Sequence, residues 1–110
     1  RSANLNNANS DDKTKLKSLL KGGAVIDLRQ STDKGYKKDP SLSNVQDIAI
    51  PIKGEATAKG YKKTFVNDSA ARSQFGKVIT TIANLNGPAL VHCTYGKDRT
   101  GWTVDHVYRW

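Results

Sequence analysis

Apolar side chains recur at helical spacing in two stretches of the chain. In the first stretch, Leu16, Leu19 and Leu20 form an apolar stripe, and Ser10 stands where a helix N-cap is favoured. The second stretch begins at Ser69, and its apolar residues follow a similar spacing: Phe75, Val78, Ile79, Ile82 and Leu85. Both patterns predict amphipathic helices with one face turned toward a core.

Short segments rich in apolar residues lie beside these helices and predict three strands. They span residues 24–28, 45–52 and 89–92. The first reads Ala-Val-Ile-Asp-Leu, and such a run is typical of a strand buried on both faces of a parallel sheet. Pro51 lies near the end of the second segment and favours a sheet edge or a strand exit, because proline cannot donate to the hydrogen-bond ladder.

The remaining segments are less regular. Residues 61–67 fit neither period clearly, and a further helix is predicted from about Asp98. Helices that alternate with short strands predict an α/β fold with a mainly parallel central sheet flanked by helices. The 110 residues suit one domain, and we expect residues 1–110 to form a single domain.

The composition favours anionic partners. The formal net charge is +8 and the sequence pI is about 9.8, which suits phosphorylated substrates, acidic lipid headgroups or nucleic acid. Nucleic-acid binding is not expected, because the lysines are scattered and only 7% of the residues are aromatic. No apolar run is long enough to predict a transmembrane segment.

The chain contains one cysteine and no methionine. One cysteine excludes an intramolecular disulfide and a zinc cage built from cysteines. Because the sequence begins at Arg1, we expect that a leader was removed or that the sequence starts inside a longer protein. A removed leader would favour a secreted or cell-envelope bacterial protein. The oligomeric state is left open.

The cysteine lies in the most informative stretch, VHCTYGKDRTGW at residues 91–102. A strand is predicted to lead into Cys93, and a helix is predicted to begin where the loop ends. Such a loop can direct successive backbone N–H groups to one point and form an anion site. Gly96 permits a tight turn, and Arg99 can hold two phosphate oxygens. This positive environment also lowers a thiol pKa, so Cys93 is a candidate nucleophile.

This stretch resembles the signature of the cysteine-dependent protein tyrosine phosphatase superfamily, which is His-Cys, five residues, Arg, then Ser or Thr. The fuller string HCTYGKDRTG is similar to the bacterial tyrosine/dual-specificity and lipid-active branch. RSANL at residues 1–5, VIDLR at 25–29 and IPI at 50–52 resemble the same family in the same order. The resemblance extends to about Val104. It implies that the family's C-terminal helices are missing, so that the domain is a fragment or is truncated.

The resemblance implies roles for the residues of the loop. Cys93 would be the nucleophile, Arg99 would hold the phosphate, and Thr100 would assist breakdown of the intermediate. His92 would orient the loop and lower the thiol pKa. Lys97 resembles the added cation of phosphoinositide-active members. The phosphate cradle would consist of the backbone amides of Thr94, Tyr95, Gly96, Lys97, Asp98 and Arg99.

The general acid, which protonates the leaving group, is open among four carboxylates. Asp98 lies in the loop itself, and Glu55 follows the IPI segment, where relatives often carry a carboxylate. Asp27 and Asp47 are further candidates. We also expect Asp27 to form a structural ion pair with Arg29 at the end of the first strand.

We therefore expect an enzyme that hydrolyses phosphate monoesters through a cysteinyl-phosphate intermediate, without a metal or an organic cofactor. The substrates would be phosphotyrosine, extending to phosphoserine, phosphothreonine or phosphoinositides. One alternative is a non-catalytic phosphate-binding module, either a pseudophosphatase or a truncated fragment. A second is a rhodanese-type sulfurtransferase, although Lys97, Arg99 and Thr100 favour phosphate over sulfane sulfur.

Overall fold

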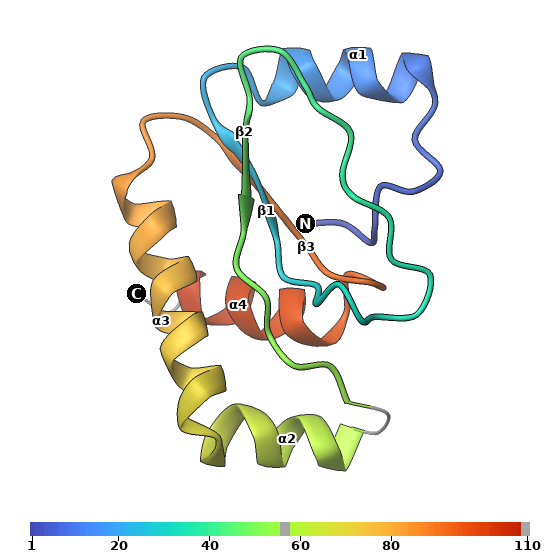
Figure 1. Ribbon diagram of the computed structural model, residues 1–110. Coiled ribbons are helices and arrows are strands. Elements are labelled where there is room, and N and C mark those ends of the chain that lie inside the picture. Colours follow the sequence, from blue (N-terminus) through green and yellow to red (C-terminus); the bar gives the residue numbers. More distant parts are fainter. Residues whose placement is uncertain (56–57, 109–110) are drawn as a thin grey trace.

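A sheet of three parallel strands organises the fold (Figure 1). The computed structural model describes residues 1–55 and 58–108, apart from the side chains of residues 58, 62 and 108. β1 (Ala24–Asp27) lies between β2 (Gln46–Ala49) and β3 (Ala89–His92). Asp27 is in register with both Ala49 and His92, so the carboxyl ends of the strands meet at one edge of the sheet.

Helices cover both faces of this sheet. The first, α1 (Ser10–Leu19), lies on one side, and the others lie on the opposite side or below it in Figure 1: α2 (Ala58–Asn67), α3 (Ser69–Asn84) and α4 (Asp98–Tyr108). None of the helices described has the length and apolarity needed to cross a membrane. The predicted α/β fold with a parallel sheet flanked by helices is confirmed.

Two apolar cores lie on opposite faces of the sheet, because successive residues of a strand point to opposite sides. Val25 of β1 packs in the smaller core with Leu20 and Leu42. Ile26 and its partner in register, Val91 of β3, belong to the larger core. That core also takes side chains from the three helices on its side, among them Phe65, Phe75, Val78 and Trp102.

The helix predicted around Leu16 is present as α1, but it differs from the prediction in two respects. Its N-cap is Asn9 and not Ser10, because the Asn9 side chain accepts from the Asp12 amide while the Asp12 carboxylate accepts from the Asn9 amide. The apolar stripe is also only partly buried: Leu20 is 6% exposed, whereas Leu19 is 71% exposed. Neighbouring helical residues point about 100° apart, so Leu19 faces solvent when Leu20 packs on the sheet.

The second predicted strand is an edge strand, as expected, but it is shorter than predicted. β2 ends at Ala49, before Pro51. The amides of Ile50 and Ile52 still donate to carbonyl oxygens of Asp27 and Leu28 at 2.9 Å, so the chain continues beside β1 past the end of the strand. Residues 61–67, whose sequence fits neither period clearly, are helical within α2. The predicted helices from Ser69 and from Asp98 are confirmed.

Candidate active site

Residues 93–97, here called the cysteine loop, connect β3 to α4 at the carboxyl edge of the sheet. The first residues of the chain lie beside this loop. The Asn4 amide donates to the Thr94 carbonyl at 3.0 Å, and Arg1 Nη2 donates to the Gly96 carbonyl at 2.8 Å. The loop is therefore held between a sheet edge, a helix N-terminus and the N-terminal segment.

The turn in the cysteine loop requires glycine at position 96. The φ angle of Gly96 is +70°, in the left-handed region that glycine adopts without steric cost. A Cβ at this position would lie 2.5 Å from the carbonyl group of Ser2. The N-terminal segment thus packs directly against the backbone of the turn.

Cys93 opens the loop and its side chain is buried. Burial by itself raises the pKa of a thiol. Here the nearby Thr100 hydroxyl, the backbone amides of Thr100 and Gly96, and the Arg99 guanidinium outweigh burial and lower the pKa of Cys93 below its ordinary value. Because the thiolate is the nucleophilic form, this environment populates a nucleophile at lower pH than a free cysteine would.

The Arg99 guanidinium is buried and is held by the segments that follow β1 and β2. Its Nη1 donates to the Ile52 carbonyl at 3.0 Å and to the Leu28 carbonyl at 3.4 Å. Its Nη2 donates to the Asp33 carboxylate at 2.6 Å and to Thr94 Oγ1 at 3.2 Å. The fifth N–H group, on Nε, has no hydrogen-bond partner within the part of the chain that the structure describes.

Among the described residues, two buried side-chain polar atoms have no hydrogen-bond partner: Arg99 Nε and Thr100 Oγ1. Both residues act on the Cys93 thiol, because the Arg99 charge and the Thr100 hydroxyl favour its thiolate form. A buried donor left without a partner costs about 1–3 kcal/mol. Such groups are expected where a ligand supplies the missing acceptor, and an oxyanion beside Cys93 would supply it.

Asp33 is a residue of this site that the sequence did not reveal. Its Oδ2 atom accepts hydrogen bonds from Arg99 Nη2 at 2.6 Å and from Thr94 Oγ1 at 2.7 Å. Burial would raise the pKa of Asp33, but these two bonds and the Arg99 charge lower it below its ordinary value. Asp33 is therefore ionised at neutral pH and joins the loop between β1 and β2 to the cysteine loop.

A buried ion-pair network lies next to the cysteine loop, at the carboxyl ends of β1 and β3. The predicted strand-end pair is confirmed, with Arg29 Nε 3.0 Å from Asp27 Oδ1. Arg29 Nη2 also lies 3.0 Å from Asp39 Oδ1, and Asp39 Oδ2 lies 2.6 Å from His92 Nε2. The other ring nitrogen, His92 Nδ1, lies 3.2 Å from the Cys93 carbonyl oxygen. The network therefore reaches from β1 to the nucleophile candidate.

Three members of this network, Asp27, Asp39 and His92, offer ligand-type atoms within 4.8 Å of one another. Both carboxylates are already paired with the Arg29 guanidinium, which supplies the positive charge that a metal ion would bring. We therefore describe the cluster as an ion-pair network and not as a metal site.

Two of the four general-acid candidates lie in surroundings that do not suit the role. Asp27 is buried in the ion-pair network, where its carboxylate accepts from Arg29 Nε and Nη2 at 3.0 Å. Asp47 lies exposed on the edge strand β2, in register with Val25. No hydrogen bond or ion pair joins either carboxylate to Cys93 or Arg99 among the described residues.

The other two candidates lie nearer the loop. Asp98 is the first residue of α4, and its half-buried carboxylate lies 4.0 Å from Lys97 Nζ. Glu55 follows β2 and accepts a hydrogen bond from Thr64 Oγ1 at 2.6 Å. Glu55 also lines the same cavity as Arg99.

This cavity has a volume of about 310 Å³ and opens beside the cysteine loop. It is lined by side chains from that loop, from α2 and from the segments after β1 and β2, among them Asp33, Glu55, Tyr61, Thr94, Tyr95 and Arg99. Tyr95 is 77% exposed at its rim, and Tyr61 is half-buried. The cavity therefore combines two tyrosine rings with the buried Arg99 guanidinium.

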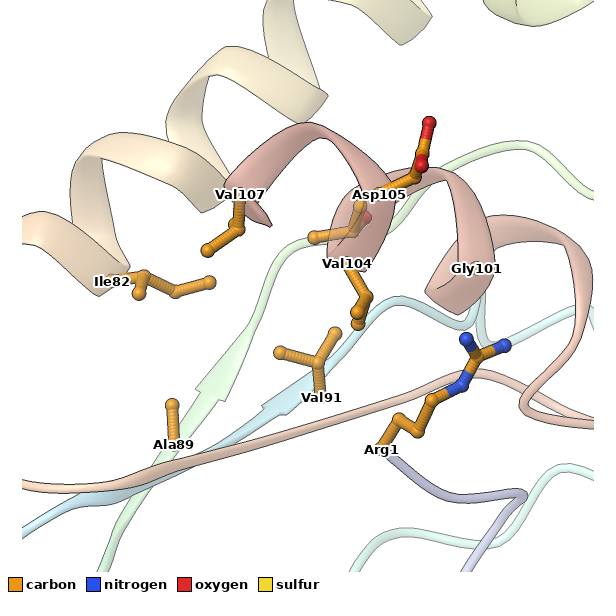
Figure 2. A pocket seen from close by; sticks show the side chains of 9 residues that line it. Arg1, Ile82, Ala89, Val91, Gly101, Val104, Asp105 and Val107 are labelled. Atoms are coloured by element: carbon orange, nitrogen blue, oxygen red, sulfur yellow. The ribbon is translucent and has the colours of Figure 1, made fainter. Parts of the chain in front are cut away.

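A larger groove of about 700 Å³ lies elsewhere, between α3, β3 and α4. Figure 2 shows apolar side chains gathered around it, including Ile82, Val91, Val104 and Val107. Arg99 lines the smaller cavity but not this groove, and Cys93 lines neither of the two. The larger of these two cavities is therefore not the one that contains candidate catalytic residues.

Comparison with known proteins supplies the family. A search of curated proteins found no match to the chain. A model described as the tyrosine phosphatase family matches residues 1–109, which include both strands beside the site, the cysteine loop and all the residues of the ion-pair network. The chain therefore belongs to the tyrosine phosphatase family and is a phosphatase.

Proposed function

We propose that this phosphatase hydrolyses phosphate monoesters through a covalent intermediate on Cys93. The observation that carries the proposal is the buried Arg99 Nε donor, which has no partner among the described residues and lies near a thiol of lowered pKa. A phosphate dianion beside Cys93 would accept from Arg99 Nε and from the backbone N–H groups of residues 94–99. It would thereby satisfy a charged donor that the protein leaves open.

The proposed chemistry has two steps. In the first, the Cys93 thiolate attacks phosphorus, an S–P bond forms, and the P–O bond to the leaving group breaks while a carboxylic acid protonates the leaving oxygen. Arg99 Nε donates to one phosphoryl oxygen during this transfer, and the guanidinium charge stabilises the others. In the second, water attacks the phosphocysteine, the carboxylate takes the proton of the water, and Thr100 donates to the departing thiolate. The products are an alcohol or phenol and inorganic phosphate.

Asp98 and Glu55 are the two candidates for the acid. Asp98 is adjacent to Arg99 in sequence, and its only ion pair among the described residues is the 4.0 Å contact with Lys97. Glu55 lines the cavity, but it accepts a 2.6 Å hydrogen bond from Thr64 that it would have to exchange for the leaving group. The dependence of the rate on the leaving group distinguishes the two carboxylates.

For the substrate, we propose phosphotyrosine first, with phosphoserine, phosphothreonine and phosphoinositides as the other classes. The aromatic side chains of Tyr61 and Tyr95 line the cavity and can pack against a phenyl ring. Lys97, whose side chain is 80% exposed, adds a cation that suits substrates with further negative charge.

The test is a phosphate-release panel on phosphotyrosine peptides, phosphoserine peptides, phosphoinositides and para-nitrophenyl phosphate, with Cys93→Ser as the control. We expect the highest kcat/KM on phosphotyrosine peptides and no turnover by Cys93→Ser. Phosphate binding without turnover on any substrate would instead support a non-catalytic phosphate-binding module. Sulfur transfer from thiosulfate to cyanide without phosphate release would support the rhodanese-type alternative.

A further inference from the structure

The shortest contact of His92 is with Asp39, a residue outside the lining of the cavity that contains Arg99. The His92 side chain is fully buried and the Asp39 side chain nearly so, and His92 Nε2 lies 2.6 Å from Asp39 Oδ2. Asp39 comes from the loop that joins β1 to β2 and precedes His92 by 53 positions. It does not line the cavity that contains Arg99.

Each ring nitrogen of His92 faces an acceptor. Nε2 faces the Asp39 carboxylate, and Nδ1 lies 3.2 Å from the Cys93 carbonyl oxygen. A neutral imidazole carries only one N–H, so two acceptors favour the imidazolium, which carries two. Burial lowers the pKa of His92, but the hydrogen bond and the charge of Asp39 outweigh burial and raise it above its ordinary value.

The other charged groups near His92 are more distant or are already paired. Asp27 Oδ1 lies 3.9 Å from His92 Nε2 and is bonded to Arg29. Arg29 also pairs with Asp39, so two carboxylates balance one guanidinium and one imidazolium. Asp47 acts on His92 only through space, from the exposed edge strand. Asp39 is therefore the direct partner of the ring.

We propose that Asp39 is a positioning residue for the nucleophile: its carboxylate keeps His92 as an imidazolium, which holds the Cys93 carbonyl and favours the thiolate. The proposal rests on the proposed function only in taking Cys93 as the nucleophile. His92 is adjacent to Cys93, whereas Asp39 lies beyond the ring. Removal of the Asp39 carboxylate would also discharge the His92 imidazolium. Because the imidazolium is the nearer of the two charges, the electrostatic potential at the Cys93 sulfur would become less positive.

Asp39→Asn tests the proposal, because it keeps the shape and one acceptor atom but removes the charge. We expect the thiol pKa to rise by about 1 unit in this variant. Alkylation by iodoacetamide at a fixed pH below the thiol pKa should then be about tenfold slower. The chain has one cysteine, so thiolate absorbance and alkylation both report on Cys93 alone.

The matched control is Asp47→Asn, which removes an exposed carboxylate from the same region. Loss of the Asp47 carboxylate removes a negative charge and no positive one, so the pKa of the Cys93 thiol should stay unchanged or fall. Circular dichroism and thermal unfolding establish that both variants are folded. A folded Asp39→Asn protein whose thiol pKa equals that of the wild type overturns the proposal.

A second measurement decides the matter if Asp39→Asn does not fold. The chain has two histidines, so proton NMR of the wild type gives two ring titrations, which a His106→Gln variant assigns. A His92 ring that stays protonated well above the ordinary histidine pKa supports the proposal, and a ring that is uncharged at neutral pH overturns it. Neither measurement needs turnover, so a failure of the proposed function is seen separately, as absent phosphate release.

Discussion

Gly96 is the residue on which the backbone of the cysteine loop most directly depends. Its φ of +70° and its contact with the Ser2 carbonyl both exclude a side chain. The amides on either side of it can converge on an anion only while this turn is kept. A side chain at position 96 would therefore disturb the turn on which the proposed phosphate binding depends.

We predict that Gly96→Ala lowers the free energy of unfolding by about 1–3 kcal/mol and reduces kcat/KM, because alanine is strained at this φ and its Cβ would meet Ser2. Gly76→Ala is the control, since no atom lies within 4 Å of a Cβ there. In the middle of α3 this change should stabilise the protein by about 0.5–1 kcal/mol. Denaturant unfolding measures both, and equal effects would contradict the account.

The general acid is also decided at the level of single residues. We predict that the variant that removes the acid, Asp98→Asn or Glu55→Gln, loses kcat on poor leaving groups but retains it on good ones, because a good leaving group needs no proton. A series of aryl phosphates of increasing phenol pKa measures this dependence. If neither variant steepens the dependence of kcat on phenol pKa, neither carboxylate is the acid.

At the level of elements, the loop between β1 and β2 supports the cysteine loop and the residues on either side of it. Asp33 binds Arg99 and Thr94, and Asp39 binds His92, the residue before Cys93. Both contacts are carboxylate bonds between segments far apart in sequence. This loop is therefore a support for the site and not only a connection between strands.

We predict that Asp33→Asn lowers the free energy of unfolding by about 2 kcal/mol at neutral pH, because it removes one partner of a nearly buried ion pair. The pKa of Asp33 is lower in the folded than in the unfolded chain. The stabilisation is therefore present above the ordinary aspartate pKa and is lost as pH falls through the lowered value. Urea unfolding at a series of pH values should show the difference between the two proteins closing toward acid. A difference that is constant with pH would exclude this pair as its source.

The elements differ in how far their sequence predicts them. α3 is predictable because its apolar residues follow the helical period, as Phe75, Val78 and Ile82 do, and β1 is predictable because it is a short, mostly apolar run. Residues 61–67 are ambiguous in sequence, since only Tyr61 and Phe65 in that stretch have a helical spacing and lysines surround them. Asp33 and Asp39 could not be predicted, because their partners lie 66 and 53 positions away and the loop that carries them has no period.

The candidate site likewise contains residues that the sequence predicts and residues that it does not. Cys93 and Arg99 stand in a short local motif, so the sequence alone predicts that they act together. The groups that lower the pKa of Cys93 belong to the same motif, namely Thr100, Gly96 and Arg99. The acceptors that hold the Arg99 guanidinium come from other segments, at Leu28, Ile52 and Asp33. A local motif can therefore predict the reacting atoms, whereas the fold determines how those atoms are held.

At the level of the whole molecule, the net charge of +8 acts on substrates before they bind. We predict that kcat/KM falls as salt rises from low to physiological concentration, and that it falls more steeply for a multiply charged phosphoinositide than for para-nitrophenyl phosphate, because salt screens the attraction between opposite charges. Initial rates across a sodium chloride series measure this. Equal slopes for the two substrates would show that the basic surface does not steer them.

The central claim is that turnover passes through a phosphate covalently bound to Cys93. Rapid acid quench during hydrolysis of para-nitrophenyl phosphate, followed by peptide mass analysis, tests it directly. We expect one phosphoryl group on the peptide that contains Cys93, more of it in Thr100→Ala because the thiolate leaves more slowly, and none in Cys93→Ser. Phosphate release that continues with Cys93 unmodified, and that survives Cys93→Ser, would contradict it.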